Sequence, residues 1–230
     1  MKRRIQLAVF IAVVILQAQA TGSEQREKTA AVPRQNQAAY QGTIVAMGDS
    51  LTAGLGVNEN EAYPAQLERK LQAAGFHWRV VNAGISGETS SGALSRINWM
   101  LKLKPDIVVL ETGANDGLRG VDPRVTQRNI DEMLRILKKN NVLVVLAGMR
   151  MLRNLGAEYT DAFNAVYPRL AAKHNVTLVP FFLQGVAGDS SLNQRDGIHP
   201  TAEGYRIITE KIYPYVLQAI KRHREVRTGS

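Results

Sequence analysis

The chain has 230 residues, 45% of them apolar, no cysteine and a formal net charge of +9. This length fits one sizeable α/β domain with a well-filled core, and the lack of cysteine excludes disulfides, thiolate nucleophiles and thiolate metal sites. Much of the positive charge lies near the two ends, in residues 2–4 and 221–227. Because the body is only mildly basic and has no basic stripe interleaved with aromatic residues, no nucleic-acid partner is expected.

The first twenty residues have the pattern of a secretory signal peptide. Basic residues 2–4 precede a short apolar run from Ile5 to Leu16, and Ala18-Gln19-Ala20 matches a small-residue cleavage site, so cleavage is expected after Ala20. An uncleaved membrane anchor is the alternative, but a spanning helix needs about 20 apolar residues and this run is shorter. The pattern therefore predicts a periplasmic or secreted protein.

Three further segments are expected after the signal. Residues 21–41 are polar and lack periodicity, which predicts a flexible leader. Residues 42–221 form the predicted domain, in which there is no internal repeat, and residues 222–230 form a basic C-terminal tail. Such a tail is either a solvated helix end or a segment that makes weak contact with an anionic membrane surface.

Within the domain, apolar runs typical of buried strands alternate with stretches of helical spacing. The predicted strands are 43–47, 79–82, 106–111, 142–147 and 176–180. The predicted helices are 64–74, 91–103, 123–140, 158–174 and one that follows Pro200. Strict alternation favours a five-stranded parallel sheet covered on both faces, which is a three-layer α/β/α sandwich.

Four motifs carry the residues suited to chemistry. In chain order they are Gly48-Asp49-Ser50-Leu51, Gly87, Gly113-Ala114-Asn115-Asp116 and Asp196-Gly197-Ile198-His199-Pro200. The first three follow the first three predicted strands, and the fourth precedes the last helix. Because the carboxyl ends of parallel strands meet at one edge of a sheet, we expect these motifs to converge.

Ser50, His199 and Asp196 have the chemistry of a nucleophile, its base and the group that orients the base. A serine hydroxyl becomes a good nucleophile when an imidazole accepts its proton and a carboxylate fixes that imidazole's tautomer. Each residue also has a plainer role, Ser50 as a helix N-cap and the other two in a loop that caps the following helix. Thr52 replaces the second glycine of a Gly-x-Ser-x-Gly elbow, which disfavours an α/β-hydrolase.

With these motifs and the segments 82–89 and 115–120, the chain from about Thr43 to about Ala219 resembles the GDSL/SGNH hydrolases. Its strongest likeness is to the periplasmic bacterial thioesterase/lysophospholipase and arylesterase branch. The resemblance implies a flavodoxin-like fold and hydrolysis of acyl esters, acyl thioesters or lysophospholipids through an acyl-enzyme. It also implies an oxyanion hole made of the backbone N–H groups of Ser50 and Gly87 and the side-chain amide of Asn115, whereas Asp116 is assigned to structure.

No cofactor and no metal ion are implied by the sequence. It has no His-x-x-x-His pair, no phosphate-binding glycine loop and no dense carboxylate cluster. The expected partner is a small-molecule acyl ester or thioester, and the protein is expected to be a monomer. Two alternatives stay open, a carbohydrate O-acetyl esterase of the same fold and a non-catalytic lipid- or glycan-binding domain.

One segment departs from the family pattern. Relatives in the thioesterase branch have a sequence like Arg-Leu-Pro-x-Asn-Tyr-Gly after the fourth strand, where this chain has Arg150-Met151-Leu152-Arg153-Asn154-Leu155-Gly156. Leu152 stands for the proline and Leu155 for the tyrosine. Because this loop borders the acyl-binding side in the family, we expect the substrate preference of this chain to differ.

Overall fold

The structure is a computed structural model that describes residues 39–151 and 155–228. The expected signal peptide, residues 21–38 of the expected leader, and Leu152 lie outside the described residues. The strands are β1 Gly42–Gly48, β2 Trp78–Gly84, β3 Ile107–Glu111, β4 Leu143–Ala147 and β5 Thr177–Val179. The helices are α1 Ser50–Ala53, η1 Glu59–Glu61, α2 Tyr63–Ala73, α3 Ser90–Ser95, α4 Ile97–Leu101, α5 Ala114–Leu118, α6 Pro123–Lys139, α7 Ala157–Asn164, α8 Val166–His174 and α9 Ala202–Thr228.

All five strands pair in parallel, in the order β2-β1-β3-β4-β5. The register places Val45 of β1 beside Val81 of β2 and beside Val108 of β3. This confirms the predicted α/β class and its five-stranded parallel sheet. The order reverses at β1, so the crevice in which such sheets bind ligands lies beyond the carboxyl ends of β1 and β3.

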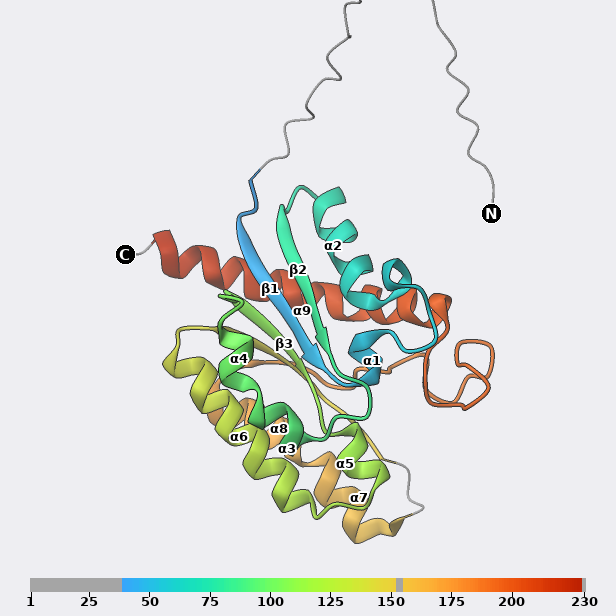
Figure 1. Cartoon of the computed structure of the whole chain (residues 1–230). Helices are drawn as coiled ribbons and strands as arrows, with labels where there is room; N and C mark the ends of the chain where they lie inside the picture. Colours follow the sequence, from blue (N-terminus) through green and yellow to red (C-terminus); the bar gives the residue numbers. More distant parts are fainter. Residues whose placement is uncertain (1–38, 152–154, 229–230) are drawn as a thin grey trace, which may run out of the picture. The chain divides into compact units, whose positions relative to one another are not determined.

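The central strands are buried because helices cover both faces of the sheet. All five residues of β3 are buried, and so are the last five of β1, as expected for parallel strands rich in Val, Ile and Leu. Helices α2 and α9 pack together on one side, while α6 and α8 pack on the other (Figure 1). These layers fix the sheet rigidly and leave its carboxyl edge for the connecting loops.

Two helices predicted as continuous are each broken in two. The predicted helix 91–103 divides into α3 and α4 at Arg96, whose φ of −104° and ψ of 5° are not helical. The predicted helix 158–174 divides into α7 and α8 at Ala165. In the second case Pro168 explains the break, because a proline has no N–H for the carbonyl of Asn164 and clashes with it.

The last helix is longer than expected. Residues 222–228, predicted as a tail, continue α9 as far as Thr228. His223 lies 3.1 Å from Asp106 and packs edge-on against Trp78, with ring centroids 5.2 Å apart. These contacts hold the end of α9 against the amino ends of the strands. No helix in the described part of the chain is both long and apolar enough to cross a membrane.

Candidate active site

Ser50 lies directly after β1, in a turn that its neighbours hold tightly. It is the first residue of the four-residue helix α1, and it is 8% exposed at the carboxyl edge of the sheet. Asp49 caps this helix, because its Oδ1 accepts a hydrogen bond from the backbone N–H of Leu51 at 2.9 Å. Gly54 ends it with a φ of 80°, which glycine adopts readily.

The structure brings Ser50, His199 and Asp196 into one hydrogen-bonded series. Ser50 Oγ lies 2.8 Å from His199 Nε2, and His199 Nδ1 lies 2.7 Å from Asp196 Oδ2. The other oxygen of Asp196 accepts the backbone N–H groups of Ile198 and His199 at 2.9 and 3.0 Å. Hydrogen bonds from the backbone and ring of His199 lower the pKa of Asp196 to about 2, so this carboxylate is ionised at neutral pH.

Gln194, which the sequence analysis did not single out, connects the turn that carries Ser50 with the loop that carries Asp196 and His199. Its amide nitrogen donates to the carbonyl of Leu55, just beyond α1, at 2.7 Å and to the carbonyl of Pro200 at 3.0 Å. Its backbone N–H also donates to the carbonyl of His199 at 2.7 Å. One side chain thus connects the serine turn to the histidine loop.

The three expected oxyanion donors lie at the ends of β1, β2 and β3. Within the described residues, the backbone N–H groups of Ser50 and Gly87 have no acceptor. The Asn115 amide donates to Asp49 Oδ2 and to the carbonyl of Glu88, each at 3.0 Å. Two free backbone donors next to a placed amide are what a developing oxyanion needs.

The loop that carries Gly87 is held from several directions. Gly87 has a φ of 78°, and its carbonyl accepts a hydrogen bond from Arg119 at 2.9 Å. The largely buried Glu88 pairs with Arg96 at 2.6 Å, and Arg96 also reaches the carbonyl of Gly48 at 3.3 Å. Arg96, the residue at which α3 and α4 divide, thus connects the Gly87 loop to the end of β1.

Asp116 supports the same loop from below. It is 1% exposed and accepts hydrogen bonds from the backbone N–H of Ser90 at 2.7 Å, the hydroxyl of Ser90 and the hydroxyl of Thr126. The Asp116 carboxylate is therefore hydrogen-bonded to other groups of the protein. Its contacts therefore fit the structural role assigned from the sequence.

Exposed aliphatic side chains gather in the loops that carry these residues. The five that lie in the segments next to the expected site residues, each between 42% and 56% exposed, are Leu55, Ile85, Leu118, Leu155 and Ile198. Scattered single apolar residues are normal on a protein surface, but several in neighbouring loops at one sheet edge indicate an apolar surface beside the site.

Met151, next to the undescribed Leu152, lies against Gly117 of α5.

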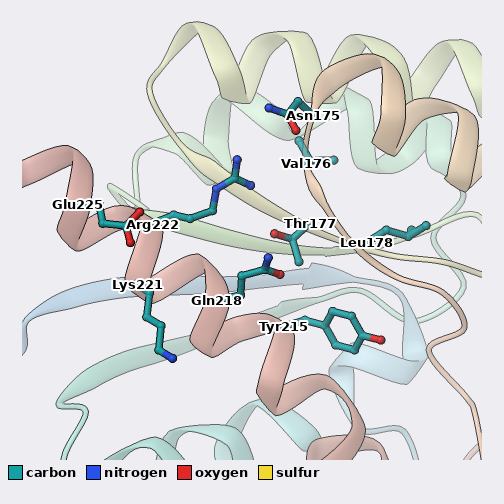
Figure 2. A pocket seen from close by; sticks show the side chains of 9 residues that line it. All are labelled: Asn175, Val176, Thr177, Leu178, Tyr215, Gln218, Lys221, Arg222 and Glu225. Atoms are coloured by element: carbon teal, nitrogen blue, oxygen red, sulfur yellow. The ribbon is translucent and has the colours of Figure 1, made fainter.

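Among the described residues, no metal-binding cluster lies at Ser50. In the part of the chain that the structure describes, no group of three or more His, Asp or Glu side chains could hold a metal ion. A depression of about 650 Å³ lies elsewhere, between β5 and the end of α9, where Thr177, Gln218 and Arg222 line it (Figure 2). It contains none of the expected site residues.

Comparison with known proteins identifies the family. The model of the GDSL-like Lipase/Acylhydrolase family matches residues 46–207, a range that includes every residue of the site described above. The chain belongs to this family. Membership of a lipase/acylhydrolase family and the esterase names of its relatives identify this protein as a carboxylic ester hydrolase, which disfavours the non-catalytic binding domain.

Named relatives of this GDSL hydrolase agree with that assignment. Esterase TesA of Pseudomonas aeruginosa is 41% identical over 179 residues, covering 77% of this chain and 89% of the relative. Thioesterase 1/protease 1/lysophospholipase L1 of Escherichia coli is 39% identical over 174 residues, covering 75% and 82%. The crystal structure of AlinE4, an SGNH-hydrolase family esterase, has a TM-score of 0.67 and 40% identity, covering 79% of this chain and 97% of AlinE4. The resemblance inferred from the motifs is thus confirmed.

Proposed function

We propose that this GDSL hydrolase cleaves acyl esters and acyl thioesters by transferring the acyl group to Ser50 and then to water. The observation that carries the proposal is the series from Ser50 Oγ through His199 to Asp196, with distances of 2.8 and 2.7 Å. A hydroxyl beside a base whose second nitrogen faces a carboxylate is the arrangement that acyl transfer requires.

In the first half of the reaction, Ser50 Oγ bonds to the substrate carbonyl carbon while its proton passes to His199 Nε2. The carbonyl electrons move onto oxygen, and Asp196 stabilises the imidazolium that forms. When the tetrahedral intermediate collapses, the bond to the leaving oxygen or sulfur breaks and His199 gives it the proton. In the second half, water repeats the sequence against the acyl-enzyme, and Ser50 recovers its proton.

The negative oxygen formed in each half needs donors that are in place beforehand. The unengaged N–H groups of Ser50 and Gly87 support this role, and the Asn115 amide lies beside them at the end of β3. Such donors act mainly on the transition state because charge develops only there. Arg119 would steady the Gly87 donor by holding its carbonyl at 2.9 Å.

The exposed aliphatic side chains in the site loops favour an acyl chain as the group recognised. Leu55, Ile85 and Ile198 flank the segments of Ser50, Gly87 and His199 and offer apolar surface to a hydrocarbon chain. The substrate classes that fit are acyl esters, acyl thioesters and lysophospholipids, in keeping with the names of the relatives. A carbohydrate O-acetyl esterase would be better served by polar side chains at these positions.

A fluorophosphonate probe tests the nucleophile. We expect the wild-type protein to be labelled at Ser50, and Ser50→Ala to lose both labelling and hydrolysis while its circular dichroism is unchanged. Ser95→Ala is the matched control, since Ser95 is exposed and donates only to the carbonyl of Gly92. Full labelling of Ser50→Ala would disprove the assignment.

A substrate panel separates the acyl hydrolase from the carbohydrate esterase. Hydrolysis would be measured on p-nitrophenyl esters of increasing acyl length, on acyl-CoA thioesters and on acetylated sugars. We expect kcat/KM to rise with chain length beyond acetyl, because each added buried methylene contributes about 0.8 kcal/mol. Preference for acetylated sugars over every acyl ester would favour the alternative.

We also infer that the mature protein begins at Thr21, outside the cytoplasm, and acts as a monomer. The signal pattern of residues 1–20, which the structure does not describe, supports cleavage and export. The monomer is carried over as an expectation from the sequence. N-terminal mass analysis of the exported protein and its elution volume in size-exclusion chromatography test these inferences. Vesicles with and without anionic lipid test a weak contact of the basic end of α9 with membranes.

A further inference from the structure

One buried carboxyl near Ser50 has no part in the mechanism above. Glu111 is the last residue of β3, after Ile, Val, Val and Leu, and like these apolar residues it is fully buried. Burying an acid is unfavourable unless the protein uses or satisfies it. The contacts of Glu111 indicate what it is used for.

A single oxygen of Glu111 contacts the serine turn on both sides of Ser50. Its Oε2 accepts a hydrogen bond from the backbone N–H of Asp49 at 3.2 Å and another from the hydroxyl of Thr52 at 2.8 Å. Asp49 precedes the nucleophile and Thr52 follows it by two residues. The turn is therefore held at both its entry and its exit by an atom from the neighbouring strand.

Gly48 makes room for this contact. A Cβ placed on Gly48 would collide with Glu111 Oε2 and with Thr52 Oγ1. The first glycine of the serine motif thus has a physical reason, because only a residue without a side chain lets Glu111 reach under the turn. Gly48, Thr52 and Glu111 form one packed unit directly below the nucleophile.

We propose that Glu111 is a positioning residue that fixes the orientation of the Ser50 turn by accepting hydrogen bonds from Asp49 and Thr52. This inference rests on the proposed function, and it concerns the geometry of Ser50 and not the bond-making steps. Small misplacements of a reacting atom are costly to catalysis. A polar anchor below the turn keeps Ser50 Oγ in reach of His199 Nε2.

Burial favours the neutral form of the Glu111 side chain. Burial raises its pKa well above the ordinary range, and the nearby Asp49 carboxylate raises it further. Its second oxygen, Oε1, has no hydrogen-bond partner among the described residues, so no donor stabilises a charge there. An accepting oxygen on a neutral side chain is what the turn needs, and a glutamine would provide the same.

Two substitutions at Glu111 give opposite expectations. Glu111→Gln keeps an accepting oxygen, so kcat, KM and the pH profile are expected to stay close to those of the wild type. Glu111→Leu keeps the approximate size but leaves the backbone N–H of Asp49 without an acceptor and Thr52 with only the Tyr63 hydroxyl at 3.4 Å. We therefore expect kcat for p-nitrophenyl ester hydrolysis to fall about 100-fold with little change in KM. Fluorophosphonate labelling of Ser50 should slow in parallel.

Controls separate positioning from loss of stability. Leu137→Ala removes a fully buried side chain of α6, far along the chain from the turn, and is expected to lower the melting temperature without lowering kcat of the folded protein. Thr52→Val removes one donor to Glu111, and combined with Glu111→Leu it should add little further loss. This single-donor variant also tests the proposal if Glu111→Leu does not fold. Wild-type kcat in Glu111→Leu, or in Thr52→Val where Glu111→Leu does not fold, would overturn the proposal.

A readout that does not depend on catalysis keeps the two proposals apart. Amide hydrogen exchange of a peptide spanning residues 48–56 should quicken in Glu111→Leu and not in Glu111→Gln, while peptides of β4 and α6 stay unchanged. If the wild-type protein neither hydrolyses esters nor reacts with the probe, the proposed function fails and the exchange experiment still decides the role of Glu111. Unchanged exchange in Glu111→Leu would refute that role.

Discussion

The Asn115 amide lies 3.0 Å from the Asp49 carboxylate, across the point where the strand order of the sheet reverses. The same carboxylate caps α1 through Leu51, so one acceptor orients both the turn of the nucleophile and the amide proposed for the oxyanion. The second hydrogen of the amide is donated to the carbonyl of Glu88. A developing oxyanion must therefore take over one of these two hydrogen bonds.

Removing this amide tests its proposed role. Asn115→Ala is expected to lower kcat by roughly 10²–10³-fold with a smaller change in KM, because the donor acts mainly on the transition state. Steady-state kinetics on a p-nitrophenyl ester measure both constants. Asn140→Ala is the control, since Asn140 lies at the exposed end of α6 and donates only to the carbonyl of Ile136. A loss confined to KM would instead indicate ground-state binding.

Asp196→Asn should inactivate the enzyme through the tautomer of His199. Two backbone N–H groups bind Asp196 Oδ1, so the oxygen of an asparagine would occupy that place and its NH₂ group would face Nδ1. The imidazole would then carry its hydrogen on Nε2, where it cannot accept the proton of Ser50. We expect kcat to fall on the order of 10⁴-fold. Activity within tenfold of wild type at neutral pH would contradict this account.

The low pKa of Asp196 gives a pH-dependent stability with a defined sign. The pKa is about 2 in the folded protein, against about 3.9 for an ordinary Asp. The ionised carboxylate thus contributes stability that is complete above about pH 4 and disappears as the pH falls through about 2. Urea unfolding from about pH 5 to about pH 2 should show a steeper loss of stability in wild type than in Asp196→Asn. Equal losses of stability with falling pH in the two proteins would contradict this role of Asp196.

Gln194→Met should weaken the alignment of the two halves of the site while keeping the size of the side chain. The hydrogen bonds to the carbonyls of Leu55 and Pro200 would be lost, and kcat is expected to fall roughly 10- to 100-fold with KM nearly constant. Gln72→Met, on the exposed face of α2, is the matched control. Equal kinetics in the two variants would show that the link is dispensable.

Leu155 is expected to tune acyl preference. It is 42% exposed in the segment where relatives of the thioesterase branch carry a tyrosine, whose hydroxyl could anchor the loop. Leu155→Tyr, alone or with Leu152→Pro, should shift the chain-length profile of ester hydrolysis and leave the pH profile unchanged. A parental profile across short and long acyl chains in both variants would show that this loop does not govern selectivity.

The sheet could be predicted from the sequence because each strand is a local apolar run closed by Gly, Asn, Pro or a charged residue. The interruption at Arg96 could not be predicted, since the leucine and isoleucine spacing continues across it; in the structure, this residue pairs with Glu88, eight residues away. Pro168 was a local signal for the other break, because a proline in the first turn of a helix often marks its start.

Within the candidate site, the order of the motifs predicted that Ser50, Gly87, Asn115 and His199 lie at one edge of the sheet, and in the structure they lie there. Gln194 and Glu111 were missed because neither belongs to one of the four motifs, and their contacts with Leu55 and Thr52 join residues 139 and 59 positions apart. For Glu111 a signal existed: an acid that ends an otherwise apolar strand must either be exposed or serve the neighbouring strand. For Gln194 no local pattern gives a comparable signal.

Ser50 and His199, the proposed nucleophile and base, are separated by 149 residues, and His199 lies just before α9, which packs against α2, β3, β4 and β5. During synthesis the nucleophile therefore emerges long before the imidazole that activates it. Under the proposed mechanism, a nascent or unfolded chain that has not yet brought His199 to Ser50 is expected to lack esterase activity. The onset of ester cleavage would then indicate that α9 has packed against the sheet. A folding experiment could follow this step without a spectroscopic label.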